Sequence, residues 1–190
     1  RYWLALMGYS EFTLLDSKNG NDKSVNIASV PAILDPNDDY MKLWSFAVVD
    51  LDGDGANEVL VYGCGVSGDM SGYLLLHQMD GRVYGLVIDH TAGAKQWFLN
   101  LKTDGTFERR DPLGTDWMSI EKMILIGRNY GFDDLAYAGS SDHGEYDSFE
   151  VDGHTAAKAE FEAVQAAQDA KPDAPWYDFT EENINVVFRS

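Results

Sequence analysis

The pattern of hydrophobic and polar positions changes its period along the chain. The opening segment RYWLALMGYSEF places Tyr2, Leu6 and Tyr9 on one side of a helical turn, which predicts a short amphipathic helix. The following residues, up to 42, hold a polar loop and two prolines among aspartates. Residues 1–42 are therefore expected to form a short helix and an irregular lead-in.

From residue 43 to residue 151 the pattern is typical of β-strands. Asp-Gly pairs at 80–81, 104–105 and 152–153 suit the positive φ angles of type I′ hairpin turns. Residues 72–89 and 96–110 are therefore expected to form hairpins, within an antiparallel β-meander. Runs of apolar and β-branched residues predict strands at 43–49, 58–62, 72–79, 82–89, 95–102, 106–110, 117–126, 132–138 and 146–151.

After Gly153 the apolar positions recur at helical spacing. Residues 155–190 predict two helices, with Thr155 and Thr180 as their N-caps and Pro172 beyond the end of the first. We therefore predict one α+β domain over residues 1–190, with an antiparallel β-meander sheet, a short N-terminal helix and two C-terminal helices. A hydrophobic share of 45% over 190 residues is enough for a sizeable core.

The charge of the chain limits its partners. Lys and Arg number 14 against 32 Asp and Glu, which gives a net charge of −18. Such a surface repels phosphate groups, so we expect no nucleic-acid partner, whereas cations are favoured. No apolar run approaches the roughly 20 residues of a transmembrane helix, and the single cysteine, Cys64, excludes an intramolecular disulfide.

The stretch FAVVDLDGDGANEVLVYG (46–63) crowds four carboxylates into a loop between two predicted strands. Asp50, Asp52, Asp54 and Glu58 occupy loop positions 1, 3, 5 and 9, and Ala56 at position 7 can offer its backbone carbonyl. Calcium takes six to eight oxygen ligands, and glycines at positions 4 and 6 permit the tight coil that such a site needs. The loop 50–58 therefore predicts a structural Ca²⁺ site. The competing interpretation is a tight turn held by Asx hydrogen bonds.

The loop is not an EF-hand, because position 12 is Val61 and both flanks are β-type. It resembles the D-x-D-x-D-G-x-x-D/E calcium loop of FG-GAP repeats in integrin α-subunit propellers. The resemblance implies that the side chains of Asp50, Asp52, Asp54 and Glu58 bind the ion. A propeller is not expected, because the loop occurs once and the chain is too short for several blades.

A wider resemblance covers most of the chain. The order RYWLAL, FAVVDLDGDGANEVLV, FLNLKTDGTF and the C-terminal AKPDAPWYDFTEENI is similar to a family of uncharacterised exported proteins and lipoproteins of Gram-positive gut bacteria, mostly Clostridia. It implies an extracellular or cell-surface-anchored protein without assigned catalytic residues. The start at Arg1, without Met, is expected of a chain whose leader has been removed.

Two other functions remain open at the level of sequence. Five tryptophans allow a surface module for glycans or peptides, which needs at least two of them exposed on one sheet face. A carboxylate-dependent hydrolase needs a pocket with a carboxylate or histidine of perturbed pKa, and Asp133-Asp134 and 142–145 (DHGE) are the clusters that suggest it. The sequence gives no ligand, substrate or oligomeric state, and a non-enzymatic function is the leading hypothesis.

Overall fold

The computed structural model describes residues 1–16, 20–35, 40–65, 71–89, 97–111 and 116–189. Helices and strands both occur, and most of the regular structure is sheet, in agreement with the mixed class predicted. Contacts between residues group the chain into two compact units, which are described separately. The first comprises Arg1–Val49, Asn57–Ala94 and Pro175–Ser190, and the second comprises Asp50–Ala56 and Lys95–Ala174.

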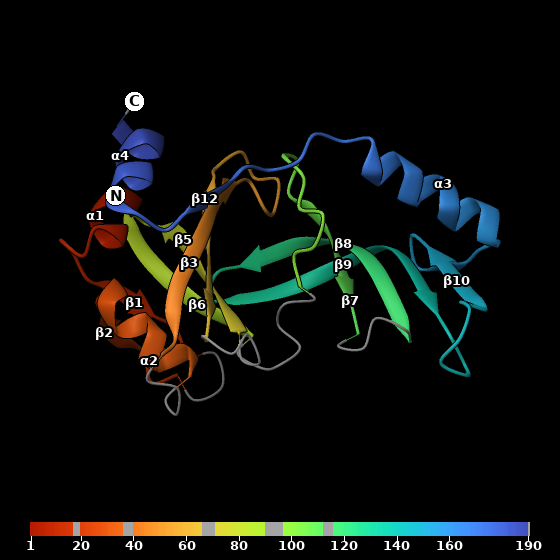
Figure 1. The fold of residues 1–190 in the computed structure, drawn as a ribbon, viewed down its shortest axis with the longest axis horizontal. Helices are drawn as coiled ribbons and strands as arrows, with labels where there is room; N and C mark the ends of the chain where they lie inside the picture. Colours follow the sequence, from red (N-terminus) through yellow and green to blue (C-terminus); the bar gives the residue numbers. More distant parts are fainter. Residues whose placement is uncertain (17–19, 36–39, 66–70, 90–96, 112–115, 190) are drawn as a thin grey trace. The chain divides into compact units, whose positions relative to one another are not determined.

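The first unit is built on a sheet that has seven strands among the described residues. Consecutive strands β3 to β6 are antiparallel neighbours, whereas β1 pairs in parallel with β6. The sheet is therefore mixed, with an antiparallel meander at its centre (Figure 1). Its order is β12 (Trp176–Asp178), β3 (Lys42–Val49), β4 (Glu58–Cys64), β5 (Ser71–Met79), β6 (Arg82–Asp89), β1 (Phe12–Leu14) and β2 (Lys23–Val25).

The core of this unit joins one sheet face to three short helices, α1 (Tyr2–Leu6), α2 (Val30–Leu34) and α4 (Glu181–Arg189). Most residues along the central strands β4 and β5 are buried, and they lie on both faces of the sheet. Each large apolar side chain buried in this way contributes roughly 1.5–3 kcal/mol. The buried cluster includes Leu6, Leu34, Phe46, Val61, Leu74 and Ile184.

The second unit contains a five-stranded antiparallel sheet and helix α3 (Lys158–Asp169), counted over its described residues. Helix α3 lies beside β10 (Figure 1). Phe161 of α3 packs against Met118, Ile120, Ala136 and Ala138, which share one face of the sheet. The strand order is β11 (His154–Thr155), β10 (Ser148–Val151), β9 (Asn129–Gly139), β8 (Trp117–Ile126) and β7 (Thr106–Arg110).

Two of the three Asp-Gly turns have the predicted geometry. Asp80-Gly81 and Asp152-Gly153 have positive φ at both residues, as a type I′ turn requires. At Asp104-Gly105 only the glycine has positive φ, and its N–H donates to the carbonyl of Lys102. This third turn is therefore a longer hairpin loop, and the prediction of a type I′ turn there was wrong.

The predicted strand at 95–102 is also corrected by the structure. Residues 95 and 96 lie outside the described residues, and 97–102 make only isolated bridges, at Leu99 and Lys102. Phe98 and Asn100 both have φ of 50°, which interrupts an extended strand. The predicted hairpin at 96–110 is thus reduced to a few contacts with β7.

Two further local predictions were wrong. Residues 30–34, expected to be irregular, form helix α2 after a 3₁₀ turn, η1 (Ile27–Ser29), because Pro31 sits in the first helical turn, where proline is tolerated. Helix α3 has Ala157 as its N-cap, while Thr155 lies in β11. The predicted cap at Thr180 is confirmed, since its Oγ1 accepts a hydrogen bond from the N–H of Asn183 at 3.2 Å.

Candidate metal centre

The acidic loop connects β3 to β4. The last pair of the β3–β4 ladder is Val49 with Glu58, so Asp50 starts the loop and Glu58 opens the next strand. Leu51 is fully buried and anchors the loop, whereas 53–57 are exposed. The local sequence explains this arrangement, because strand-forming residues end at Val49 and resume at Val59.

The two glycines of the loop adopt the predicted left-handed conformation. Gly53 has φ of 75° and Gly55 has φ of 90°. Only glycine occupies this region without steric cost, so the pair allows the chain to coil tightly. The sequence predicted positive φ at both glycines, and the structure agrees.

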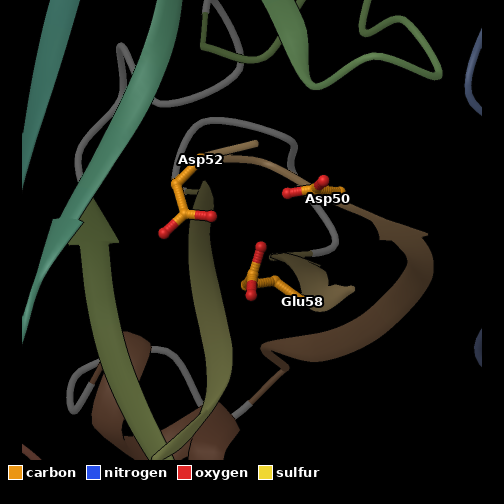
Figure 2. A group of neighbouring side chains, drawn as sticks. All are labelled: Asp50, Asp52 and Glu58. Atoms are coloured by element: carbon orange, nitrogen blue, oxygen red, sulfur yellow. The ribbon is translucent and has the colours of Figure 1, made fainter. Parts of the chain in front are cut away.

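Three of the predicted carboxylates converge on one space, as Figure 2 shows for Asp50, Asp52 and Glu58. Ligand oxygens of the three all lie within 4.8 Å of one another. Two oxygens that bind one Ca²⁺ at about 2.4 Å can lie no more than about 4.8 Å apart. The three carboxylates could therefore hold one metal ion, with Glu58 buried and the other two half-buried.

Backbone hydrogen bonds fix Asp50 at the start of the coil. Its Oδ1 accepts from the N–H of Gly53 at 2.7 Å and its Oδ2 accepts from the N–H of Gly55 at 3.0 Å. These are the turn contacts of the competing Asx interpretation. The two interpretations are compatible, because a carboxylate has about four lone-pair sites and two remain for a cation.

Asp54 and Ala56 are not part of the group of three. Asp54 is exposed, and its Oδ1 accepts from the N–H of Ala56 at 2.7 Å. Their predicted roles, as a side-chain ligand and a carbonyl ligand, remain predictions.

A histidine that sequence reasoning did not connect with the loop contacts Glu58. His77 lies on β5, the strand next to β4, and is only 9% exposed. Its Nδ1 lies 3.2 Å from Oε1 of Glu58. This contact orients the buried carboxylate, and only the strand register, which the sequence does not reveal, could have identified it.

Two other residues support the loop from distant positions in the sequence. A Cβ atom on Gly105 would lie 2.1 Å from the carbonyl oxygen of Asp50, so the β7 turn passes directly against the loop backbone. A Cβ atom on Gly53 would lie 2.1 Å from Nζ of Lys122, so this ammonium group lies against the coil. The DGTF sequence marked Gly105 as a turn residue, but nothing in it indicated the contact.

The acidic cluster at 142–145 lies in an exposed loop, whereas Asp133 and Asp134 lie in strand β9. His143 lies 2.5 Å from Oδ1 of Asp116, and this contact raises the pKa of the exposed imidazole. Ser140 donates to Asp142, and Ser141 donates to Asp147. Such local pairs are typical of a solvated acidic loop.

The tryptophans divide into two groups. Trp44 on β3 is 54% exposed and Trp176 on the neighbouring strand β12 is 38% exposed. The other three, Trp3, Trp97 and Trp117, are half-buried. The hypothesis of a binding module, which required exposed tryptophans, therefore remains a prediction.

Within the described part of the chain, no helix is both long enough and apolar enough to cross a bilayer. Comparisons with protein-family models, with curated proteins and with solved structures find no match to this chain.

Proposed function

We propose that this chain binds one divalent cation of the calcium class in the loop 50–58, and that the ion stabilises the β3–β4 hairpin. The observation that supports the proposal is the convergence of Asp50, Asp52 and Glu58 within 4.8 Å. Two like charges 4 Å apart repel by roughly 4 kcal/mol at an effective dielectric constant of about 20. A dication converts this repulsion into attraction, which couples metal binding to folding.

The chemistry of the donors favours calcium. All three side chains offer carboxylate oxygens, which suit hard cations rather than zinc or copper. Mg²⁺ requires a near-octahedral shell and retains several waters, whereas Ca²⁺ accepts irregular shells of six to eight oxygens. We propose that Asp54 and the carbonyl of Ala56 complete the shell when the ion binds, together with water.

The proposed setting is outside the cell, where calcium is plentiful. The support is the resemblance of the loop to FG-GAP calcium loops and of the chain to exported bacterial proteins. The ion in this proposal is structural, and the domain is non-enzymatic. We also propose that the domain binds a partner at the cell surface, for which a glycan is one candidate.

Thermal unfolding with and without calcium tests the cation site. A ligand at about 100 times its Kd stabilises the folded state by about 2.7 kcal/mol, which corresponds to a rise in Tm of about 5–11 °C for a chain of this size. We expect such a rise between EDTA and millimolar CaCl₂. Asp52→Ala and Glu58→Gln should abolish most of it.

Glu150→Gln is the matched control, because Glu150 is an exposed carboxylate of β10 outside the loop. It should keep the full calcium response. A wild-type Tm that does not respond to calcium, or an equal response in Asp52→Ala, would contradict the proposal.

A further inference from the structure

A second site is suggested by a small pocket on the sheet face opposite α3 in the second unit. The cavity has a volume of about 190 Å³ and is lined by Arg109, Trp117, Ser119, Asp134 and Tyr137. The register brings these side chains together, because Arg109 lies opposite Ser119 and Ser119 lies opposite Tyr137. The volume is below the roughly 300 Å³ at which drug-sized ligands begin to fit.

Arg109 is held rigidly in this pocket. Its guanidinium carbon lies 4.7 Å from the ring centre of Trp97, 5.2 Å from that of Trp117 and 5.0 Å from that of Phe132. Its Nη2 pairs with Oε1 of Glu121 at 3.0 Å. An arginine fixed by stacking and by an ion pair presents its remaining donors in one orientation.

Glu121 is a fully buried carboxyl group behind the pocket and contacts three of the lining residues. Ser119 donates to it, Arg109 pairs with it, and Asp134 lies opposite it on β9. Among the described residues, Oε2 of Glu121 and Nε of Arg109 are buried without a hydrogen-bond partner. Unsatisfied buried polar atoms are few in native proteins, so each calls for an explanation.

Burial, together with the nearby Asp134, raises the pKa of Glu121 to about 7, although Ser119 and Arg109 act in the opposite direction. The charged groups that face Glu121 from the adjacent strands are Arg109 on β7 and Asp134 on β9. Near neutral pH, Glu121 is therefore protonated in a large share of the molecules.

We propose that this pocket binds a single sugar ring, as a free monosaccharide or as the terminal residue of a glycan. Sugar hydroxyls both donate and accept hydrogen bonds, which matches a lining that presents Arg109 as donor and Asp134 as acceptor. Trp117 and Tyr137 are the aromatic residues of the lining, and an aromatic ring can pack against the C–H side of a pyranose. The Arg109 guanidinium lies over one face of the Trp117 ring, so a sugar would use the other face or the edge of that ring. The small volume limits the ligand to one ring.

A charged ligand fits the pocket less well. An organic cation would meet Arg109, and an anion would meet Asp134 and the buried Glu121. A free amino acid is the strongest competitor, because it carries both charges. The experiment therefore includes amino acids as a separate series.

The test is titration of the full chain, in CaCl₂, with methyl glycosides of glucose, galactose, mannose, N-acetylglucosamine, fucose and xylose. Calorimetry and tryptophan fluorescence are the readouts. We expect at least one glycoside to bind saturably, one per chain, with a Kd of about 0.1–10 mM. Trp117→Ala and Asp134→Asn should each weaken that binding at least about tenfold, or roughly 1.4 kcal/mol.

Trp176→Ala and Asp133→Asn are the matched controls. Trp176 is an exposed tryptophan outside the lining, and Asp133 is the exposed neighbour of Asp134 that lies opposite Lys122. Both should keep the Kd within about twofold. Circular dichroism and thermal melting establish that each variant is folded before titration.

Three results would overturn the proposal. The first is no saturable binding by any glycoside up to about 100 mM. The second is unchanged binding in folded Trp117→Ala and Asp134→Asn, which would place the sugar elsewhere. The third is saturable binding of free amino acids in place of sugars.

Discussion

At the scale of single residues, the packing of Gly105 against backbone atoms constrains the acidic loop closely. Gly105 has φ of 81°, and a Cβ atom there would overlap the carbonyl oxygen of Asp50 and approach the Cα of Leu51 to 2.9 Å. The neighbour is backbone, so it cannot move aside as a flexible side chain can. The loop geometry therefore depends on a residue far from it in sequence.

Gly105→Ala should destabilise the protein and weaken calcium binding together. Gly127→Ala is the control, because Gly127 also has positive φ, 59°, but an added Cβ would meet nothing within 4 Å. We expect a cost of about 1–2 kcal/mol for the control, from its conformation alone. Gly105→Ala should cost at least about 2 kcal/mol more. Urea unfolding with and without calcium measures the free energy of unfolding of both variants. An equal loss of stability in the two variants would contradict the close contact between Gly105 and the loop backbone.

The buried Glu121 should make stability depend on pH. Burial raises its pKa from the ordinary 4.5 to about 7, so the folded protein binds more protons than the unfolded chain between these pH values. Its contribution is therefore greatest in acid and is lost as pH rises through about 7, by an amount on the order of 2–3 kcal/mol. Glu121→Gln mimics the protonated form and should flatten the decline that wild type shows between pH 5 and pH 8. An unchanged pH profile of unfolding in this variant would count against the raised pKa.

At the scale of elements, the sequence was most informative where the pattern is local. The strands β3, β4, β5 and β6 follow from runs of apolar and β-branched residues and from the Asp80-Gly81 turn, and the glycines of the acidic loop predict its coil. The short strand β12 could not be predicted in this way, because its three residues become a strand only by pairing with β3. Phe98 is a strand-forming residue type, yet it takes positive φ, as Asn100 does.

Long-range contacts explain that misprediction. Lys102 is only 2% exposed, and its Nζ pairs with Asp173 at 2.6 Å, beyond helix α3. Its carbonyl accepts the N–H of Gly105, and the carbonyl of Leu101 accepts the N–H of Ala174. Gly105 is close to Lys102 in the sequence, whereas Asp173 and Ala174 lie about 70 residues away. The contacts with these two distant residues could not be predicted from the local sequence.

Helix α4 offers a test of how the first unit is stabilised. Ile184 is 2% exposed within the main core, whereas Val186 on the same helix is 58% exposed. Ile184→Ala should cost about 2–5 kcal/mol, because it leaves a cavity among buried side chains. Val186→Ala should change stability by less than about 0.5 kcal/mol. Chemical denaturation measures both, and similar values would show that α4 is not part of the core.

At the scale of the whole molecule, the chain carries a charge of −18, and its contacts form two compact units. The prediction of a single domain stays a prediction. The acidity has a direct consequence for stability, because repulsion among surface carboxylates opposes the compact state. Screening by salt weakens that repulsion.

In EDTA, raising NaCl from about 20 mM to about 500 mM, which shortens the Debye length well below 10 Å, should raise the Tm. The rise in Tm on adding CaCl₂ should exceed the rise with NaCl at the same ionic strength, because we expect calcium to bind at a specific site. A scan with NaCl, MgCl₂ and CaCl₂ at equal ionic strength separates the two contributions. Identical Tm values in all three salts would assign the whole effect to screening.

The most direct test of the central proposal is a crystal structure determined from crystals grown in CaCl₂, with anomalous scattering measured to identify the ion. We predict one anomalous peak among Asp50, Asp52 and Glu58, with carboxylate oxygens at about 2.3–2.6 Å. The carbonyl of Ala56 and the carboxylate of Asp54 should complete the shell. A well-ordered loop that shows only water at this position, in calcium concentrations that saturate known sites of this kind, would contradict the proposal.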